Sequence, residues 1–218
     1  MFALENLVRL GGAPPDTRCL TMPGMSERDA WSENLQHIAI YAGSFDPITL
    51  GHLDVLRRAR RLFDGLVLGI GQNPDKQPVF SFEERLAIVR ELVEDMLDAE
   101  PHGAPVRVES YTGLTVDFAR ENNACAIVRG IRNITDLASE TQIAIANRQV
   151  ADIETVFVVT GETFAFTSSS LIRQIAGLGG DLDRLSGIIP RIVINRLREK
   201  RDDPDGPLSR LIRDQQVD

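Results

Sequence analysis

Short apolar runs alternate along the chain with amphipathic segments of helical period. The runs predict strands at 38–42, 66–70, 106–109, 124–128 and 155–159. Apolar residues that recur every three to four positions predict helices at 49–63, 81–97, 115–122 and 136–150, from about 168, and after 190. Strands that alternate with helices are typical of parallel βαβ units, and uniformly apolar strands are expected where helices cover both faces of a sheet. The pattern predicts an α/β fold with a single, doubly wound, five-stranded parallel sheet of Rossmann-like type.

The two ends of the chain break this alternation. The first 35 residues contain Gly and Pro pairs and no sustained periodicity, so we expect a disordered N-terminal tail at 1–35. Polar residues interrupt the apolar patch near the start, which argues against a secretory signal. We expect the folded domain at 36–199 and a charged C-terminal tail at 200–218, a segment dense in Arg, Asp and Pro.

The charge balance narrows the class of function. With 24 Lys plus Arg against 32 Asp plus Glu, the net charge is −8, which suits neither a nucleic-acid partner nor an anionic membrane. Two cysteines exclude a disulfide scaffold, and we expect Cys125 to be a buried strand residue. No apolar run approaches the ~18 residues that a membrane helix needs. We therefore expect a cytoplasmic protein with no membrane or nucleic-acid partner.

Residues 43–52 follow the first predicted strand and enter the first helix. Gly43 permits a sharp turn, Ser44 offers a hydroxyl, and His52 lies near the positive end of the helix dipole. Free backbone N–H groups at a helix start form a natural phosphate site. The segment matches neither the P-loop nor the GxGxxG pattern, and the alternative is an ordinary strand–helix turn.

Two further segments are suited to bind anions at strand ends. Arg129 and Arg132 flank Gly130 after the fourth strand, where paired guanidinium groups could clamp a phosphate or could simply be solvated. Residues 163–170 are rich in hydroxyls before a helix, and three successive serines exceed what N-capping alone requires. Lys76 stands in a Pro-flanked loop, although an exposed loop lysine usually has no special role.

In combination, these segments resemble the HxGH nucleotidyltransferase superfamily, and most closely the bacterial phosphopantetheine adenylyltransferases. The resemblance spans about residues 38–198, and the form Thr49-x-Gly-His52, in place of His-x-Gly-His, points to this family. It rests on Tyr41-Ala-Gly-Ser-Phe-Asp-Pro-Ile-Thr-Leu-Gly-His52, Asn73-Pro-Asp-Lys-Gln-Pro78, Phe82-Glu-Glu-Arg85, Val128-Arg-Gly-Ile-Arg132, Asn147-Arg148 and Phe166-Thr-Ser-Ser-Ser170.

The resemblance implies a reaction and partners. ATP and 4′-phosphopantetheine would give dephospho-coenzyme A and pyrophosphate, a step of coenzyme A biosynthesis. Mg²⁺ would be bound mainly through the substrate phosphates, with no metal ligand from the protein. The family also implies a homohexamer.

The resemblance also implies roles for single residues. His52 would stabilise the transition state, Ser44 would bind the reacting phosphates, and Lys76 and Arg129 would hold the pantetheine phosphate. Thr115 falls at the position that contacts pantetheine. ATP would be held by Ser44, Phe45, His52, Gly130, Ile131, Arg132, Glu140, Phe164, Ala165, Phe166, Thr167, Ser168, Ser169 and Ser170.

The chain departs from the family pattern at three positions. The family often has an aromatic residue at Ser139, a Glu at Gln174 and, in some relatives, a Met at Thr115.

Two alternative functions are compatible with a similar fold. One alternative is a nicotinate-nucleotide adenylyltransferase or a cytidylyltransferase, which usually keeps His at the position of Thr49. The other is a non-catalytic nucleotide-binding module, which should have lost His52 or the basic residues.

Overall fold

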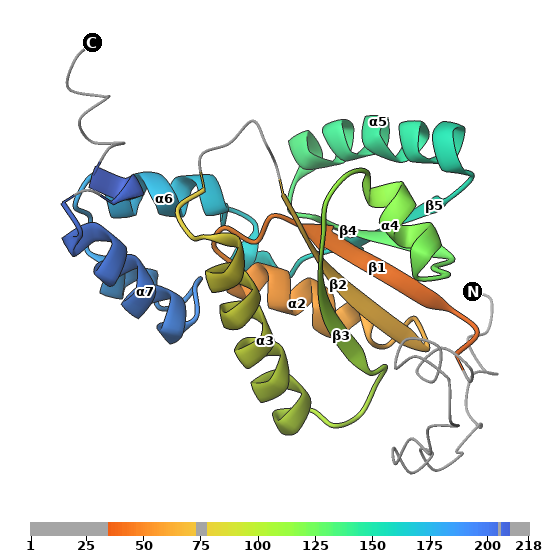
Figure 1. The fold of residues 1–218 in the computed structure, drawn as a ribbon, viewed down its shortest axis with the longest axis horizontal. Coiled ribbons are helices and arrows are strands. Elements are labelled where there is room, and N and C mark those ends of the chain that lie inside the picture. Colours follow the sequence, from red (N-terminus) through yellow and green to blue (C-terminus); the bar gives the residue numbers. More distant parts are fainter. Residues whose placement is uncertain (1–34, 73–77, 205, 210–218) are drawn as a thin grey trace, which may run out of the picture. The chain divides into compact units, whose positions relative to one another are not determined.

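A computed structural model describes residues 35–72, 78–204 and 206–209. Its five strands form one parallel sheet in the order β3-β2-β1-β4-β5, which confirms the predicted fold class (Figure 1). The strand order reverses between β1 and β4, and ligands bind at such a switch point in open α/β sheets. The strands are β1 (Ile38–Gly43), β2 (Gly65–Gly71), β3 (Val106–Tyr111), β4 (Ala126–Ile131) and β5 (Glu154–Val159).

Helices cover both faces of this sheet. A side chain at Gly130 would meet Val55 of α2 (Leu50–Ala59), whereas one at Gly69 would meet Phe118 of α4 (Thr115–Glu121). The strand register places these two glycines on opposite faces of the sheet. The helices are α2 (Leu50–Ala59), α3 (Phe82–Ala99), α4 (Thr115–Glu121), α5 (Ile134–Ala151), α6 (Ser169–Gly177) and α7 (Arg191–Asp202), with 3₁₀ turns η1 (Glu162–Phe164) and η2 (Leu182–Leu185). The sheet is therefore doubly wound, as predicted.

The central strand β1 and its neighbour β2 are the most buried strands of the sheet. In both β1 and β2, every residue except the last one of the strand is buried. The residues of β3 and β5, at the sheet edges, are mostly half-buried. Consistent with this position, β3 carries Arg107 and Glu109, which form an ion pair with each other. The uniformly apolar pattern thus marks the centre of the sheet, where helices pack on both faces.

Local sequence signals account for the helix starts. Ser81 and Glu84 form the expected capping box at α3, and Thr49 forms one at α2 with His52 in the position usually taken by Glu or Gln. Each box satisfies backbone N–H groups that a helix start leaves without an intrahelical acceptor. The α2 box also fixes the orientation of a candidate catalytic side chain, as shown below.

The structure differs from the sequence predictions in several places. The first helix ends at Ala59 rather than 63, and Cys125 is exposed just before β4, so its prediction as a core residue was wrong. Packed structure also continues past residue 199, because α7 reaches Asp202 and Leu208 is fully buried in the core. The predicted tail at 1–35 lies almost wholly outside the described residues. No described helix is both long and apolar enough to cross a membrane.

Candidate active site

A cavity of about 320 Å³ opens at the switch point of the sheet. It lies among the carboxyl ends of β1 and β4 and the first turns of α2 and α6, so it brings together the three segments that the sequence singled out. The predicted residues that line it are Ser44, Phe45, His52, Arg129, Gly130, Arg132, Glu140, Thr167, Ser168, Ser169 and Ser170.

The capping box of α2 sets the protonation pattern of His52. The backbone N–H of Thr49 donates to Nδ1 of His52 at 3.0 Å, and the backbone N–H of His52 donates to the Thr49 hydroxyl at 3.3 Å. Because Nδ1 accepts a hydrogen bond, the proton of the neutral ring is on Nε2. The Phe45 ring packs edge-on against the imidazole, with ring centroids 5.2 Å apart. The cap therefore leaves Nε2–H as a donor for a ligand in the cavity.

Burial keeps this imidazole uncharged. Burial first, and then the positive charges of Arg132 and Arg129, lower the pKa of His52 to about 4. At neutral pH the residue is thus a neutral hydrogen-bond donor. Positive charge in the cavity comes from the arginines instead.

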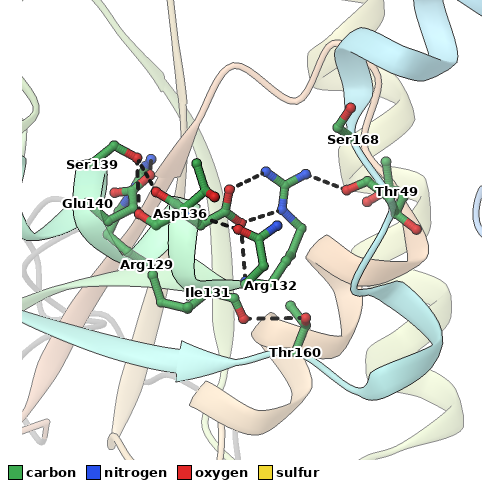
Figure 2. Close-up of polar contacts among 12 residues, drawn as sticks. Thr49, Arg129, Ile131, Arg132, Asp136, Ser139, Glu140, Thr160 and Ser168 are labelled. Atoms are coloured by element: carbon green, nitrogen blue, oxygen red, sulfur yellow. Dashed lines mark hydrogen bonds and ion pairs between the residues drawn. The ribbon is translucent and has the colours of Figure 1, made fainter.

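Arg129 is held in place by a carboxylate and a carbonyl. Its Nε and one terminal nitrogen donate to the two carboxylate oxygens of Glu140, both at 2.7 Å (Figure 2). Its other terminal nitrogen donates to the Ala42 carbonyl at 2.7 Å. Burial disfavours the charge, but the hydrogen bonds and ion pair with Glu140 outweigh it and raise the pKa of Arg129. The guanidinium is therefore permanently charged and fixed beside the end of β1.

Arg132, which precedes α5, is held in the same way by Asp136, one turn before Glu140 on that helix. It donates to the two carboxylate oxygens of Asp136 at 2.7 and 2.9 Å, and a terminal nitrogen also donates to the Thr167 carbonyl (Figure 2). Asp136 and Glu140 are four residues apart, so they lie on one face of the helix. The two arginines thus share a supporting helix, but one reaches toward β1 and the other toward the loop before α6.

The β1–α2 loop is fastened to its neighbours by Asp46, Arg85 and Arg173. The buried Asp46 carboxylate accepts the backbone N–H groups of Val79 and Phe80 at 3.0 and 2.9 Å. Arg173 of α6 donates to the Asp46 carbonyl at 2.6 Å, and Arg85 of α3 donates to the Ser44 carbonyl at 2.7 Å. These bonds hold Ser44 at the mouth of the cavity.

The three successive serines have different partners. Ser168 caps α6 by accepting the N–H of Leu171, Ser169 donates to the Pro47 carbonyl at 2.8 Å, and Ser170 accepts from Arg173 at 3.2 Å. One serine therefore suffices for the cap, as the sequence suggested. The other two tie the start of α6 to the β1–α2 loop and to a cation.

Some predicted site residues do not line the cavity. Ile131, Phe164, Ala165 and Phe166 are absent from its lining, and Phe166 is 92% exposed. Thr115 is also outside it, at the start of α4, where its hydroxyl is hydrogen-bonded to that of Tyr111 at 2.8 Å. Lys76 lies outside the described residues.

The sequence reasoning missed two residues that shape the site. Arg173 lines the cavity, and Asp136 orients Arg132. Both had a signal in the spacing, because Arg173 follows Ser170 by three positions and Asp136 follows Arg132 by four. Among the described residues, no group of three or more His, Cys, Asp or Glu side chains could hold a metal ion.

Comparison with known proteins shows which family has this fold and this site. A family model described as cytidylyltransferase-like matches residues 40–175, more than half of the chain, so the chain belongs to that family. The chain is also 50% identical over 164 residues to a phosphopantetheine adenylyltransferase of Rhodopirellula baltica, covering 75% of this chain and 88% of the relative. A phosphopantetheine adenylyltransferase of Desulfosudis oleivorans is 44% identical over 164 residues, which cover 75% and 92% of the two chains. The chain therefore belongs to the phosphopantetheine adenylyltransferase family.

A solved structure supports the fold independently. A putative nicotinate-nucleotide adenylyltransferase from Vibrio parahaemolyticus superposes with a TM-score of 0.50 at 17% identity, covering 76% of this chain and 94% of that one. This likeness concerns the fold alone. The two curated relatives, and not this structure, confirm at the level of family the resemblance found in the sequence.

Proposed function

We propose that the chain transfers the adenylyl group of ATP to 4′-phosphopantetheine, giving dephospho-coenzyme A and pyrophosphate in coenzyme A biosynthesis. The observation that carries this proposal is the meeting of a neutral imidazole donor, three arginines and two helix starts in one cavity of a family member. All of these groups favour phosphate oxygens. The described lining holds no serine–histidine pair poised for nucleophilic catalysis, because the cap places the ring proton of His52 on Nε2, which then cannot accept a serine proton.

The chemistry is then direct displacement at phosphorus. An oxygen of the acceptor phosphate attacks the α-phosphorus of ATP, and the bond to the pyrophosphate oxygen breaks, so no covalent enzyme intermediate is needed. The protein contributes by holding both phosphates in line and by stabilising the charge that develops on the phosphoryl oxygens. His52 supplies Nε2–H for this purpose, and Ser44 supplies its hydroxyl and backbone N–H.

The two arginines divide the substrates between them. Arg129 lies against the end of β1 through Ala42, where it holds the phosphate of the acceptor together with Lys76. Arg132 donates to the Thr167 carbonyl in the loop before α6, so it holds the phosphates of ATP together with residues 167–170, which line the cavity. Thr115 contacts the pantetheine arm. The assignments of Lys76 and Thr115 rest on the family resemblance.

Mg²⁺ fits this site as a partner of the substrates rather than as a ligand of the protein. The carboxylates of Glu140 and Asp136 are already engaged with arginines, and the cavity is rich in cationic donors. Such a site retains Mg²⁺ through phosphate oxygens and water. When bound, the ion would neutralise charge on the ATP phosphates.

We further propose a homohexamer in the cytoplasm, as the resemblance implies. Support for self-association comes from helix α5, whose exposed apolar residues are Ile134, Leu137, Ile143, Ile145 and Val150. Val159 at the end of edge strand β5 is also 67% exposed. Light scattering after gel filtration should give six times the chain mass, and a monomer would contradict this proposal.

An acceptor screen tests the proposed activity. The purified protein is given ATP, Mg²⁺ and either 4′-phosphopantetheine, nicotinate mononucleotide or glycerol 3-phosphate, and pyrophosphate release is measured. Only 4′-phosphopantetheine should support turnover, and that turnover should fall by about 10²–10³ in the His52→Ala variant. Preference for either of the other acceptors, or release without any acceptor, would contradict the proposal.

A further inference from the structure

The connection between β5 and α6 is docked on the first turns of α2. The carboxylate of Asp54 accepts the backbone N–H of Gly161 at 2.8 Å. Three residues along the chain, Phe164 packs on Gly51, where an added Cβ would lie only 3.2 Å from the Phe164 Cβ. Both docking residues on α2 lie within two positions of His52.

This connection supplies much of the nucleotide side of the cavity. It leads to the Thr167 carbonyl, which accepts from Arg132, and to Ser168, which starts α6. His52 belongs to α2, so the distance between His52 and these groups depends on how the connection is seated on α2. Asp54 joins the two elements by a hydrogen bond across 107 positions of sequence.

We propose that Asp54 is a positioning residue that places the nucleotide-binding connection relative to His52 by accepting the Gly161 N–H. Neither Asp54 nor Gly161 lines the cavity, so neither is assigned a contact with substrate. The inference rests on the proposed use of the connection to hold ATP.

The hydrogen bond, rather than the charge of Asp54, carries this role. Asp54 also forms an ion pair with Arg58 at 2.9 Å, but the Arg58 side chain is 50% exposed and on the same helix. Exposed ion pairs of this kind contribute little, whereas a partly buried N–H that loses its acceptor is costly. The two contacts can therefore be separated by substitution.

The test measures ATP binding and turnover for variants on both sides of the bond. Asp54→Ala removes the acceptor, and we expect a roughly tenfold weaker Kd and higher KM for ATP, with KM for 4′-phosphopantetheine within about twofold. Asp54→Asn keeps an oxygen that can accept from Gly161, so it should stay close to wild type. Arg58→Gln removes the ion pair and should also stay close to wild type.

Gly161 offers a matched pair of variants. Its φ of −58° suits proline, so Gly161→Pro removes the N–H without a forbidden backbone conformation. A Cβ there would make only ordinary contacts at 3.5 Å, so Gly161→Ala keeps the N–H and serves as the control. Gly161→Pro should weaken ATP binding as Asp54→Ala does, and the double variant should be no weaker than either single variant.

The outcomes separate this inference from the proposed activity. If the protein does not turn over 4′-phosphopantetheine, calorimetric ATP binding still reports on Asp54. An unchanged ATP Kd in Asp54→Ala, equal losses in Asp54→Ala and Asp54→Asn, or additive losses in the double variant would each overturn the inference. Should Asp54→Ala fail to fold, the comparison of Gly161→Pro with Gly161→Ala decides.

Discussion

The β1–α2 and β4–α5 regions deliver hydrogen-bond donors to the same cavity by different physical means. In the first, a helix cap orients a neutral imidazole, and burial lowers the pKa of His52 to about 4. In the second, carboxylates of α5 orient two guanidinium groups, and Glu140 raises the pKa of Arg129. One cavity therefore combines a donor whose charge is suppressed with donors whose charge is permanent.

The difference assigns separate tasks to the two regions. Fixed cations attract phosphates in every state of a phosphoryl-transfer reaction, so under the proposed function we expect the arginines to contribute chiefly to binding. A neutral donor adds little to ground-state attraction, but it strengthens when negative charge develops on the oxygen it faces. Substitutions in β1–α2 should thus reduce kcat, and those in β4–α5 should raise KM.

The largest effect is expected at His52. In His52→Ala, the Thr49 hydroxyl can still accept the backbone N–H of residue 52, so one half of the capping box remains. Loss of the Nε2–H donor should lower kcat by about 10²–10³, while loss of the other half of the cap should cost only about 1 kcal/mol of stability. Steady-state kinetics and thermal unfolding measure both. A kcat near that of wild type would remove His52 from the chemistry.

A smaller effect is expected from the supporting carboxylates. Glu140→Gln and Asp136→Asn each replace a bidentate ion pair with weaker neutral contacts, so each arginine becomes less well placed. We expect KM for 4′-phosphopantetheine to rise several-fold in Glu140→Gln, and KM for ATP to rise several-fold in Asp136→Asn, on the order of 1 kcal/mol.

Glu199→Gln is the matched control, because its partner Arg196 is an exposed residue of α7. This variant should have the kinetics of wild type. If it changed KM as much as Glu140→Gln, the effect would reflect general charge and not the placement of an arginine.

Outside the kinetics, the expected effect is on stability against pH. The pKa of His52 falls from 6.5 to about 4 on folding, so between these values the unfolded chain binds more protons at this position than the folded one. Acidification from pH 6.5 to 4 should therefore destabilise the wild type more than His52→Gln. Urea unfolding at pH 7 and pH 5 measures the difference in free energy of unfolding. An identical loss in both proteins would show that the imidazole is not kept neutral by the fold.

The sequence was sufficient for the fold class and for most of the cavity. The strand and helix periodicities are local properties, and the three segments at strand ends were bound to meet once the sheet was parallel. The partners of the arginines were harder to predict. Glu140 was assigned to ATP, yet its two oxygens bind Arg129, and Arg173 was missed although it lines the cavity. Such contacts depend on how helices pack on the sheet, which periodicity does not specify.

Binding measurements on the two arginine variants test whether the cavity is divided between the two substrates. ATP is titrated into Arg129→Ala and Arg132→Ala by calorimetry, and then 4′-phosphopantetheine is titrated into each. Arg132→Ala should weaken ATP binding by about one to two decades and change the acceptor little, and Arg129→Ala should do the reverse, as expected for loss of charge-assisted bonds. If both variants lost affinity for both ligands equally, or if the effects were exchanged, the division of the cavity between the two substrates would be wrong.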